Sequence, residues 1–391
     1  MSEKKSMFWI TILKNVTASY FDTFFVCYFF EVANYDVVPL AKYYITVYLF
    51  LSIGFILIRK FIKRNRKVEF FRIGIAFMAL YIALIMILKE KIINYVIPVG
   101  MLCGLANGLY YFPKNLMDTE KIDNESRQKF NGTISIISTI ASILIPIILG
   151  ILLTFYSYVS ISKIFFILFI ILYILTFWIK DEGKYTTKKI EWKKFFNLLK
   201  TNKSVRNVLL GPLLSGFTYS SGVMGVVITL FKIYNFKTNL NLGVIDSLCA
   251  ILTLLSCVIF TTVKKNKFSK IMIISSLVSF VTLILSSFVP NKATLIIYLI
   301  VRSSFINILS QITTNVRVNL SNCDELKNDL KTEYYLISEF IYSISRCLGY
   351  ILLLVVCLLL GTKYVNLVLI LPAISILLEG IIIGNLSKED K

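Results

Sequence analysis

The sequence predicts an all-α integral membrane protein with twelve transmembrane helices in two six-helix, pseudo-symmetric halves. Three observations lead to this prediction: an apolar composition, a series of long apolar segments, and an internal repeat. Of the 391 residues, 57% are hydrophobic and only 16% are charged, whereas about a quarter of a soluble domain is charged. Stretches such as 134–158 and 164–179 are apolar and are separated by short polar breaks. About 20 apolar residues span a bilayer as a helix.

Each apolar segment is expected to be a helix, because backbone groups have no water partner in hydrocarbon and the apolarity is continuous instead of alternating. No cleavable signal peptide is expected, since no small-residue cleavage site follows the first apolar stretch. The twelve predicted spans are 8–33, 39–58, 70–88, 93–113, 131–155, 161–179, 206–231, 240–262, 271–289, 293–316, 333–360 and 364–385.

The distribution of lysine and arginine predicts a multi-pass protein of the cytoplasmic membrane with both termini in the cytoplasm. Most of the 42 basic residues then lie in the two termini and in cytoplasmic loops at 59–69, 114–130, 180–206, 263–270 and 317–332. The outer loops hold eight: Lys42, Lys89, Lys91, Lys163, Lys232, Lys237, Lys292 and Lys363. This asymmetry follows the positive-inside rule. The basic run IRKFIKRNRK at 58–67 is therefore a topological signal that can meet lipid headgroups. It is not interpreted as a nucleic-acid-binding site, which needs a soluble basic surface.

Cysteine and histidine usage argues against metal chemistry. The seven cysteines lie mostly in apolar segments, without metal-ligand spacing or a paired framework, and are interpreted as small packing residues. Histidine is absent, which removes the commonest metal ligand and general base. The sequence predicts no metal site, no cofactor and no catalytic residues.

An internal repeat divides the chain at its polar centre. At an offset of 201, FEVANY (30–35) matches FKIYNF (231–236), and IKRNR (62–66) matches VKKNK (263–267). At an offset of 200, Asn107 and Asn115 match Asn307 and Asn315. Repeated halves are a recurrent transporter plan with the substrate site near the midplane between them. The predicted domains are an N-terminal half (1–180), a cytoplasmic central loop with a short amphipathic helix (181–205), and a C-terminal half (206–391).

These features resemble the major facilitator superfamily over essentially the whole chain. The points of resemblance are the 6+6 spans, a basic loop after span two with a twin after span eight, and the long central loop. GLANGLYYFPKNLMDTE (104–120), followed by RQKFNG (127–132), looks like a subgroup found in low-GC Gram-positive bacteria that has no settled substrate. The resemblance implies the major facilitator fold and transport by alternating access.

The superfamily's motif in the loop after span two is only partly present. Gly54 and Arg59 align with its first glycine and first arginine, while Ile58 stands at the position of the acid and Phe61 at that of the second glycine. A gating salt bridge of the usual kind is therefore not expected. The candidates for the gating loop are Gly54, Arg59, Arg64 and Arg66.

A second motif of the superfamily, in span five, is associated with exporters and reads Gly-x8-Gly-x3-Gly-Pro-x2-Gly. Gly132 and Pro146 fit it, and Ala141 is a small replacement. Ile145 does not fit, and Gly150 falls one residue late. The partial match favours export.

Ionisable side chains inside a bilayer cost at least about 2.5–3.5 kcal/mol and are retained mainly where they face protein or water. Asp22 lies near the middle of span one and shares a helical face with Asn15 and Ser19. It is the candidate for proton coupling. The alternative is a carboxylate that only bonds neighbouring helices.

Span ten contains Arg302, and span eleven contains Arg346 with Glu339 two turns below it. Glu339 and Arg346 are about 10 Å apart by helical rise, too far for a direct bond without long side chains or water. Either arginine could contact an anionic substrate or pair with Asp22. The alternative is a fixed ion pair that locks two helices.

Spans four and ten have matching polar stripes, and the resemblance to the superfamily, whose spans four and ten line the cavity, implies that these stripes do the same. Asn107 and Tyr111 begin one stripe, and Asn307 and Gln311 begin the other. The alternative is hydrogen bonding between helices, worth only about 0.6 kcal/mol on average. The cavity candidates are Asn15, Ser19, Asn107, Tyr110, Tyr111, Tyr219, Arg302, Asn307, Gln311, Glu339 and Arg346.

Together these observations predict a secondary active transporter that exports a small molecule in exchange for protons. Uptake of a nutrient, or a polytopic sensor or scaffold without transport, remains an alternative. An enzyme is not expected, since the acids at 118–125 show no metal-ligand spacing. The expected partners are a small-molecule substrate, a proton or another coupling ion, and membrane lipids, with no nucleic acid and a monomeric chain.

Overall fold

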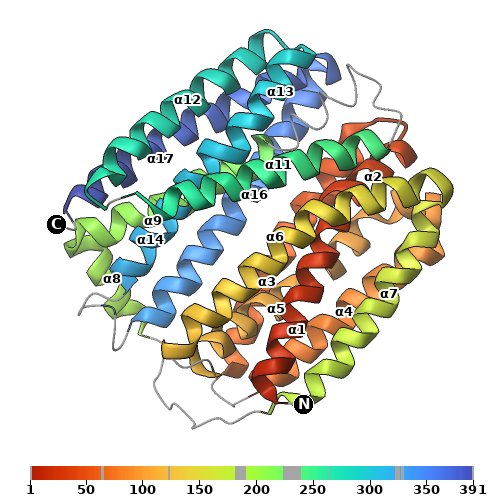
Figure 1. Cartoon of the computed structure of the whole chain (residues 1–391), viewed down its shortest axis with the longest axis horizontal. Helices are drawn as coiled ribbons and strands as arrows, with labels where there is room; N and C mark the ends of the chain where they lie inside the picture. The colour runs from red at the N-terminus through yellow and green to blue at the C-terminus, as the bar shows by residue number, and fades with distance from the viewer. Residues whose placement is uncertain are drawn as a thin grey trace. The chain divides into compact units, whose positions relative to one another are not determined.

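The computed structural model describes residues 2–62, 66–121, 124–180, 191–222, 239–263, 265–321, 326 and 330–389. At some helical positions, Ser19 and Asp22 among them, only the backbone is described. Helices make up the regular structure throughout these ranges (Figure 1). The predicted all-α class is therefore confirmed.

The chain forms two compact units, of which the first comprises Met1–Thr187 and Phe236–Ala250. Within it, α3 and α4 pack against α5, α4 packs against α7, and α1 packs against α6. Its elements are α1 (Glu3–Ser19), η1 (Tyr20–Phe25), α2 (Val26–Val32), α3 (Val37–Ile62), α4 (Lys67–Leu88), η2 (Lys89–Tyr95), α5 (Val96–Lys121), α6 (Asn124–Phe155), α7 (Tyr158–Leu175) and η3 (Thr176–Trp178).

The second unit comprises Lys188–Asn235 and Ile251–Lys391. Here α17 packs along α12 and α9, and α16 packs along α9. Its elements are α8 (Trp192–Thr201), α9 (Lys203–Phe217), η4 (Thr218–Gly222), η5 (Lys265–Lys267), α12 (Phe268–Phe288), α13 (Lys292–Val301), η6 (Arg302–Ile306), α14 (Asn307–Ser321), α16 (Lys331–Leu360), η7 (Thr362–Leu369) and α17 (Ile370–Glu389).

Helix α11 (Asn239–Thr261) has residues in both units, since the first ends at Ala250 and the second resumes at Ile251. The predicted boundaries assign 236–250 to the C-terminal half, whereas these residues cluster with the first unit. In the central segment, α8 is the short helix that the sequence predicts there.

Several helix ends are set by local side chains. Asn202 accepts a hydrogen bond from the Val205 backbone amide at 3.0 Å at the start of α9. Asn291 and Thr294 form a reciprocal capping box at the start of α13. These caps satisfy amide groups that have no partner inside the helix. At the other end of a helix, Gly361 terminates α16 with φ +80°, a conformation that favours glycine.

Helices α3 and α5 approach closely because glycines line their contact. Gly100, Gly104 and Gly108 recur every fourth residue and so share one face of α5. A Cβ at Gly104 would overlap the Val47 carbonyl oxygen, and a Cβ at Gly54 would lie 3.1 Å from the Gly108 Cα. Small residues of this kind let membrane helices pack backbone to backbone. Gly54, a predicted gating residue, thus has a packing position in this crossing.

Within the described ranges, nine helical stretches are long and apolar enough to cross a membrane. One of them, Lys67–Lys114, contains the two predicted spans 70–88 and 93–113, so the nine stretches account for ten of the twelve predicted spans. The other two, 8–33 and 206–231, are interrupted: α1 runs into η1, and α9 runs into η4. The nine stretches are consistent with the predicted spans.

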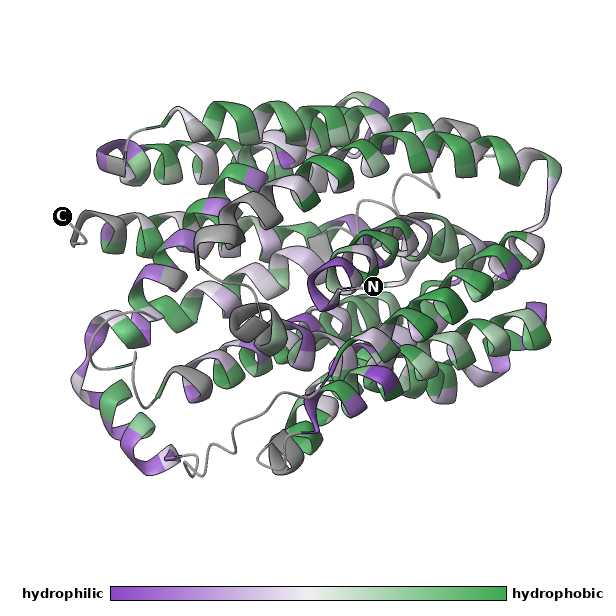
Figure 2. Ribbon diagram, turned by 60° about the horizontal axis from the view of Figure 1, so that its bottom comes forward, coloured by the Kyte–Doolittle hydropathy of each residue, from purple (hydrophilic) through white to green (hydrophobic). Residues whose placement is uncertain are grey.

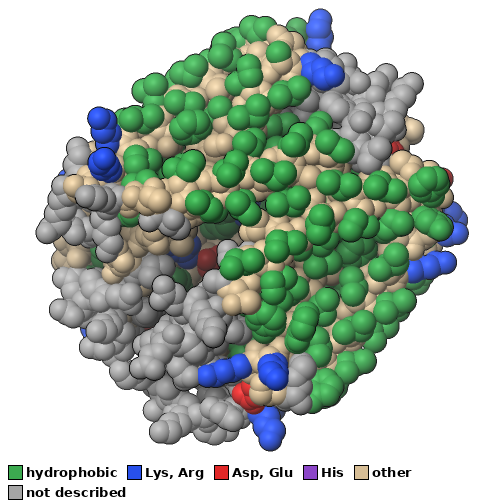
Figure 3. Space-filling view, viewed as in Figure 1, with side chains coloured by type: hydrophobic (Ala, Val, Ile, Leu, Met, Phe, Trp, Pro, Cys, Tyr) green, Lys and Arg blue, Asp and Glu red, His purple; other side chains and the backbone are tan. Residues whose placement is uncertain are grey.

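The outward faces of these helices are apolar. Figure 2 shows hydrophobic residues along the helices and hydrophilic residues at many helix ends. In Figure 3, apolar side chains cover the visible surface over α6, α11 and α12, while lysine and arginine side chains lie mainly near its margin. On α6, Ile136, Ile140, Leu144 and Ile148 are each at least half exposed and recur every four residues. Such faces suit contact with lipid.

Candidate functional site

Three π-helical turns interrupt the helices of predicted spans one, seven and ten. They are η1 (Tyr20–Phe25), η4 (Thr218–Gly222) and η6 (Arg302–Ile306). These turns contain three residues that the sequence singles out: Asp22, Tyr219 and Arg302. The first two turns begin at Tyr20 and Thr218, 198 residues apart, close to the offset of the sequence repeat. π-Turns are rare overall, but those that occur are often found at functional sites. Their positions therefore mark each of these three helices as a candidate for function.

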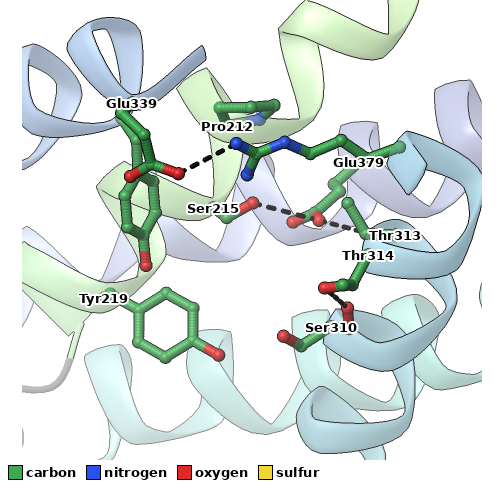
Figure 4. Close-up of a pocket in the computed structure, with 10 residues that line it drawn as sticks. Pro212, Ser215, Tyr219, Ser310, Thr313, Thr314, Glu339 and Glu379 are labelled. Carbon is green, nitrogen blue, oxygen red and sulfur yellow. Dashed lines mark hydrogen bonds and ion pairs between the residues drawn. The ribbon is translucent and has the colours of Figure 1, made fainter. Parts of the chain in front are cut away.

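A polar cavity of about 180 Å³ lies within the second unit. Residues from α9, η4, α14, α16 and α17 line it, and Figure 4 shows their side chains converging on it. On α14 the lining residues are three, four and seven positions from Ser310, so they share one helical face. The lining residues are Pro212, Ser215, Tyr219, Ser310, Thr313, Thr314, Arg317, Glu339, Tyr342 and Glu379.

The carboxyl group of Glu379 is buried at this cavity, with 2% of the residue exposed. Its Oε1 lies 2.9 Å from Thr313 Oγ1 and 3.1 Å from Ser215 Oγ. Figure 4 shows both hydroxyls pointing at this oxygen. Among the residues that the structure describes, Glu379 forms no ion pair. Burial of a charge without a cation is unfavourable, so the two hydroxyls and the protonation state of Glu379 must compensate.

Arg317 and Glu339 form an ion pair across the same cavity. Arg317 Nη2 lies 2.9 Å from Glu339 Oε1, and the side chains are 20% and 30% exposed. The pair links α14 to α16, and the Arg317 guanidinium also lies 5.6 Å from the Tyr335 ring centroid. Glu339 thus forms an ion pair between two helices, and its partner Arg317 is not one of the two arginines that the sequence singled out.

Arg346 lies against two tyrosines that line the cavity. Its guanidinium is 3.9 Å from the Tyr342 ring centroid and 5.8 Å from that of Tyr219, and it donates a hydrogen bond to the Tyr342 hydroxyl. The two rings pack edge to face at 6.3 Å. Arg346 thus packs against two tyrosines that line the cavity and is not itself a lining residue.

Replacement of Arg346 by alanine is expected to lower the thermal midpoint of the purified protein, because the cation–π contact contributes about 0.5–2 kcal/mol. Thermal unfolding in detergent measures the change. Arg346→Lys, which keeps the charge, is expected to lose less, and Lys270→Ala on the exposed side of α12 is the control. Unchanged stability and unchanged compound binding in Arg346→Ala would exclude both a structural and a substrate role.

The polar stripe of span ten divides between a helix contact and the cavity. Asn307 Nδ2 donates to Ser256 Oγ at 2.8 Å, and Gln311 Nε2 donates to Cys257 Sγ at 2.9 Å. Both bonds join α14 to α11. Thr314, three residues after Gln311 on α14, lines the cavity instead. Arg302 is half-buried at the first position of η6.

In the first unit, a buried lysine lies beside two predicted cavity tyrosines. Lys14 is 8% exposed, and its Nζ is 5.8 Å and 5.7 Å from the ring centroids of Tyr110 and Tyr111. Tyr110 is buried, whereas Tyr111 is 40% exposed. The structure thus brings two of the cavity candidates together around a cation that the sequence interpretation did not select.

The other candidates of the first unit make local or interhelical bonds. Asn15 Nδ2 donates to Ser138 Oγ at 2.7 Å, which joins α1 to α6. Asn107 Nδ2 donates to the Cys103 carbonyl oxygen at 2.9 Å on its own helix. The side chains of Ser19 and Asp22 lie outside the described part of the chain, so their roles stay predictions.

For the predicted gating loop, the structure describes Gly54 and Arg66. Arg66 Nε lies 3.4 Å from Glu69 Oε2, with both side chains about half exposed. A surface pair of this kind contributes little. The side chain of Arg59 and the whole of Arg64 lie outside the described residues. Gating by this loop therefore stays a prediction.

The sequence interpretation missed three charged residues at these sites: Lys14, Arg317 and Glu379. Lys14 and Glu379 lie inside predicted spans, so the rule that selected Asp22 could also have selected them. Arg317 lies one residue beyond the predicted span 293–316 and was assigned to a loop. Because the predicted span ended one residue before Arg317, this arginine was not considered as a charge inside the membrane.

Comparisons with known proteins agree with this architecture. The family model of the Major Facilitator Superfamily matches residues 19–350. The uncharacterized protein YqgE of Bacillus subtilis (strain 168) is 21% identical over 269 residues, 67% of this chain and 61% of that protein. An uncharacterized protein in the sodM 3' region of Geobacillus stearothermophilus is 24% identical over 115 residues, 29% of this chain and 54% of that protein. The chain thus spans about 54–61% of the length of these curated relatives.

Solved structures of bacterial transporters have a similar fold. A bacterial homologue of the iron transporter ferroportin, in an inward-facing state, matches with a TM-score of 0.66 at 13% identity, over 98% of both chains. The E. coli fucose:proton symporter matches with a TM-score of 0.63 at 12% identity, over 100% of this chain and 97% of that one. A bacterial homologue of the lysosomal transporter Spinster matches at 0.62 and 13% identity, over 99% and 96%. At these identities the likeness concerns the fold alone.

Proposed function

Because the chain belongs to the major facilitator superfamily, we propose that it is a secondary active transporter that exports a small molecule by alternating access in exchange for protons. Membership of this family supports a multi-pass membrane transporter. We propose the direction of transport, the coupling ion and the residues responsible for each.

The single observation that carries the proposal is the interruption of three helices at candidate residues. In transporters, helices broken near the membrane midplane supply substrate and ion sites. Here the turns η1, η4 and η6 contain Asp22, Tyr219 and Arg302 respectively. A regular helix would satisfy its backbone internally at these positions, whereas a π-turn alters the hydrogen-bond ladder. We therefore propose that each of these three helices contributes residues to substrate transport.

Proton coupling is assigned to Asp22, the carboxylate of the first interrupted helix. A carboxyl group that alternates between two environments can bind a proton in one and release it in the other. The fold likeness to a fucose:proton symporter supports protons as the coupling ion. The named solutes of the similar structures, iron and fucose, differ too much to select a substrate for this chain.

Export is proposed from the span-five motif. Its proline, Pro146, lies in a tight contact of the first unit, where a Cβ at Gly243 would overlap the Pro146 carbonyl oxygen. Ser247 Oγ donates to the nearby Ile143 carbonyl at 2.6 Å. The partial exporter motif therefore coincides with a close crossing of α6 and α11.

The proposed arrangement is a monomer in the cytoplasmic membrane with both termini in the cytoplasm. The basic residues of the predicted cytoplasmic loops support this orientation, and they can also meet anionic headgroups. The halves 1–180 and 206–391 would alternate access about the central loop 181–205.

A proteoliposome assay tests the function. Purified protein is reconstituted with a pH-sensitive dye inside, and ethidium, as an amphipathic compound, or fucose, as a nutrient, is added under an imposed proton gradient. Export predicts that compound and protons move in opposite directions. Movement in the same direction would favour uptake. A sensor or scaffold would give no compound-dependent proton movement in a panel of either class, and that result would reject the transport proposal.

A further inference from the structure

Asp22 is the proposed proton-binding carboxyl group of the first unit. Another buried carboxyl group lies in the second unit, on a helix that the proposed pathway does not use. Glu379 belongs to α17, the last predicted span, and is buried at the cavity between α9, α14 and α16. Figure 4 shows its carboxyl group between the hydroxyls of Ser215 and Thr313. The hydrogen bonds and charges around Glu379 determine which protonation state is favoured.

The hydrogen bonds of Ser215 favour a neutral Glu379. A serine hydroxyl has one proton to donate, and the Gly211 carbonyl oxygen lies 2.5 Å from Ser215 Oγ, closer than Glu379 Oε1 at 3.1 Å. If the Ser215 proton bonds to Gly211, the contact with Glu379 is a hydrogen bond only when Glu379 donates. An ionised carboxylate has no proton to donate, whereas the neutral acid has one. A protonated Oε1 can donate to Ser215 and accept from Thr313 at 2.9 Å.

The charges around Glu379 also favour the neutral form. On the cavity wall, Arg317 is already paired with Glu339 at 2.9 Å, and the other titratable groups there are the phenols of Tyr219 and Tyr342. Among the described residues of the elements packed most closely against α17, the further cations lie away from this point. Lys203 and Arg206 lie two or more turns before Ser215 on α9, and Lys270 on α12 and Lys363 in η7 are exposed. Among the described residues that line the cavity, Arg317 is the cation, and it is paired with Glu339, so an ionised Glu379 would add a further negative charge there.

We propose that Glu379 is a proton-binding site of the second unit, with Ser215 and Thr313 as the hydroxyls that exchange hydrogen bonds when the proton leaves. On release, the O–H bond at Oε1 breaks, its electron pair stays on the carboxylate, and the proton passes to water in the cavity. The Ser215 hydroxyl then turns from Gly211 to donate to Glu379, beside the donation from Thr313. Proton binding at Glu379 is argued from the geometry alone. A role of this proton in driving transport rests on the proposed function.

Difference infrared spectroscopy of the full chain in lipid membranes tests the site with the proton as the only ligand. The carbonyl band of a neutral carboxylic acid is expected at acid pH and is expected to disappear at alkaline pH. Glu379→Gln should remove this band, because the amide has no titratable proton. Glu69→Gln is the control, since it removes a half-exposed surface carboxylate of the first unit, and it should leave the band in place.

Two further variants keep the test decisive if Glu379→Gln fails to fold. Ser215→Ala and Thr313→Val each remove one hydrogen-bond partner and should shift the frequency of the band. A pH-dependent band that survives Glu379→Gln and is unmoved in both hydroxyl variants would overturn the assignment. So would a band that belongs to Glu379 but does not change with pH, or one that responds to sodium ions at constant pH.

Failure of this site and failure of the transport function give different results. The infrared experiment needs no flux, and it can be repeated in Asp22→Asn, where the Glu379 band should persist. A protein whose Glu379 titrates but which moves no compound would keep the proton site and reject the transporter proposal. Proton-coupled flux in a protein that shows no Glu379 band would keep the transporter proposal and reject the proton site.

Discussion

Asp22→Asn is expected to reduce gradient-driven flux to the level of protein-free vesicles. Asparagine keeps the size of the side chain and can still form hydrogen bonds, but it cannot bind and release a proton. Asp22 lies in the π-turn η1, in the first of the three interrupted helices. The measurement is compound-dependent proton movement in dye-loaded proteoliposomes, with the same amount of protein in each sample.

A matched acid elsewhere in the first unit provides the control for Asp22. Glu69 is about half exposed and forms a surface pair with Arg66, so Glu69→Gln is expected to retain wild-type flux. Both variants should elute from size exclusion and unfold as the wild type does. Wild-type flux in Asp22→Asn would remove Asp22 from the coupling mechanism. Retained exchange of compound without a gradient would separate a loss of coupling from a loss of the pathway.

Gly104→Leu is expected to prevent the first unit from folding. A Cβ at this position would already overlap the Val47 carbonyl oxygen and lie 3.0 Å from the Leu51 amide nitrogen. The obstructing atoms are backbone atoms of α3 and the Phe50 Cβ, and no side-chain rotation moves any of them. Overpacking of a core costs about 1–3 kcal/mol where side chains can adjust, and a leucine pressed against backbone is expected to exceed that range.

Membrane yield and the fraction of monodisperse protein after size exclusion measure the effect of Gly104→Leu. Gly104→Ala should give an intermediate loss, because it adds the Cβ without the rest of the side chain. Ile97→Leu is the control, since Ile97 lies on the same helix α5 and is 53% exposed. Normal yield and stability of Gly104→Leu would show that α3 and α5 do not pack as the structure has them.

The membrane helices were predictable because their signal is local. A run of about 20 apolar residues has to be helical in a bilayer whatever its neighbours are. Interruptions inside a span were not predictable: the segments 8–33 and 206–231 read as continuous spans, yet η1 and η4 interrupt them. A π-turn depends on how neighbouring helices pack around one helical turn, and hydropathy along the chain does not report that packing.

The candidate site was predicted in part. The sequence selected Tyr219 and Glu339, which line the cavity, and Arg346, which packs behind it. Asn307 and Gln311 were equally good candidates by spacing, but they bond α11. Spacing on one helix defines a shared face, and it does not define which neighbour that face meets.

The sequence by itself determined the class of the protein: apolar segments set the membrane helices, basic loops predicted their orientation, and the two halves and motifs indicated a major facilitator transporter. Only the tertiary structure decided the partners of the charges. Arg317 with Glu339, and Glu379 with Ser215 and Thr313, are pairs between residues 22, 164 and 66 positions apart. Hydropathy is additive along the chain and can be read from it, whereas a buried charge is stabilised by whichever polar groups distant helices bring within about 3 Å.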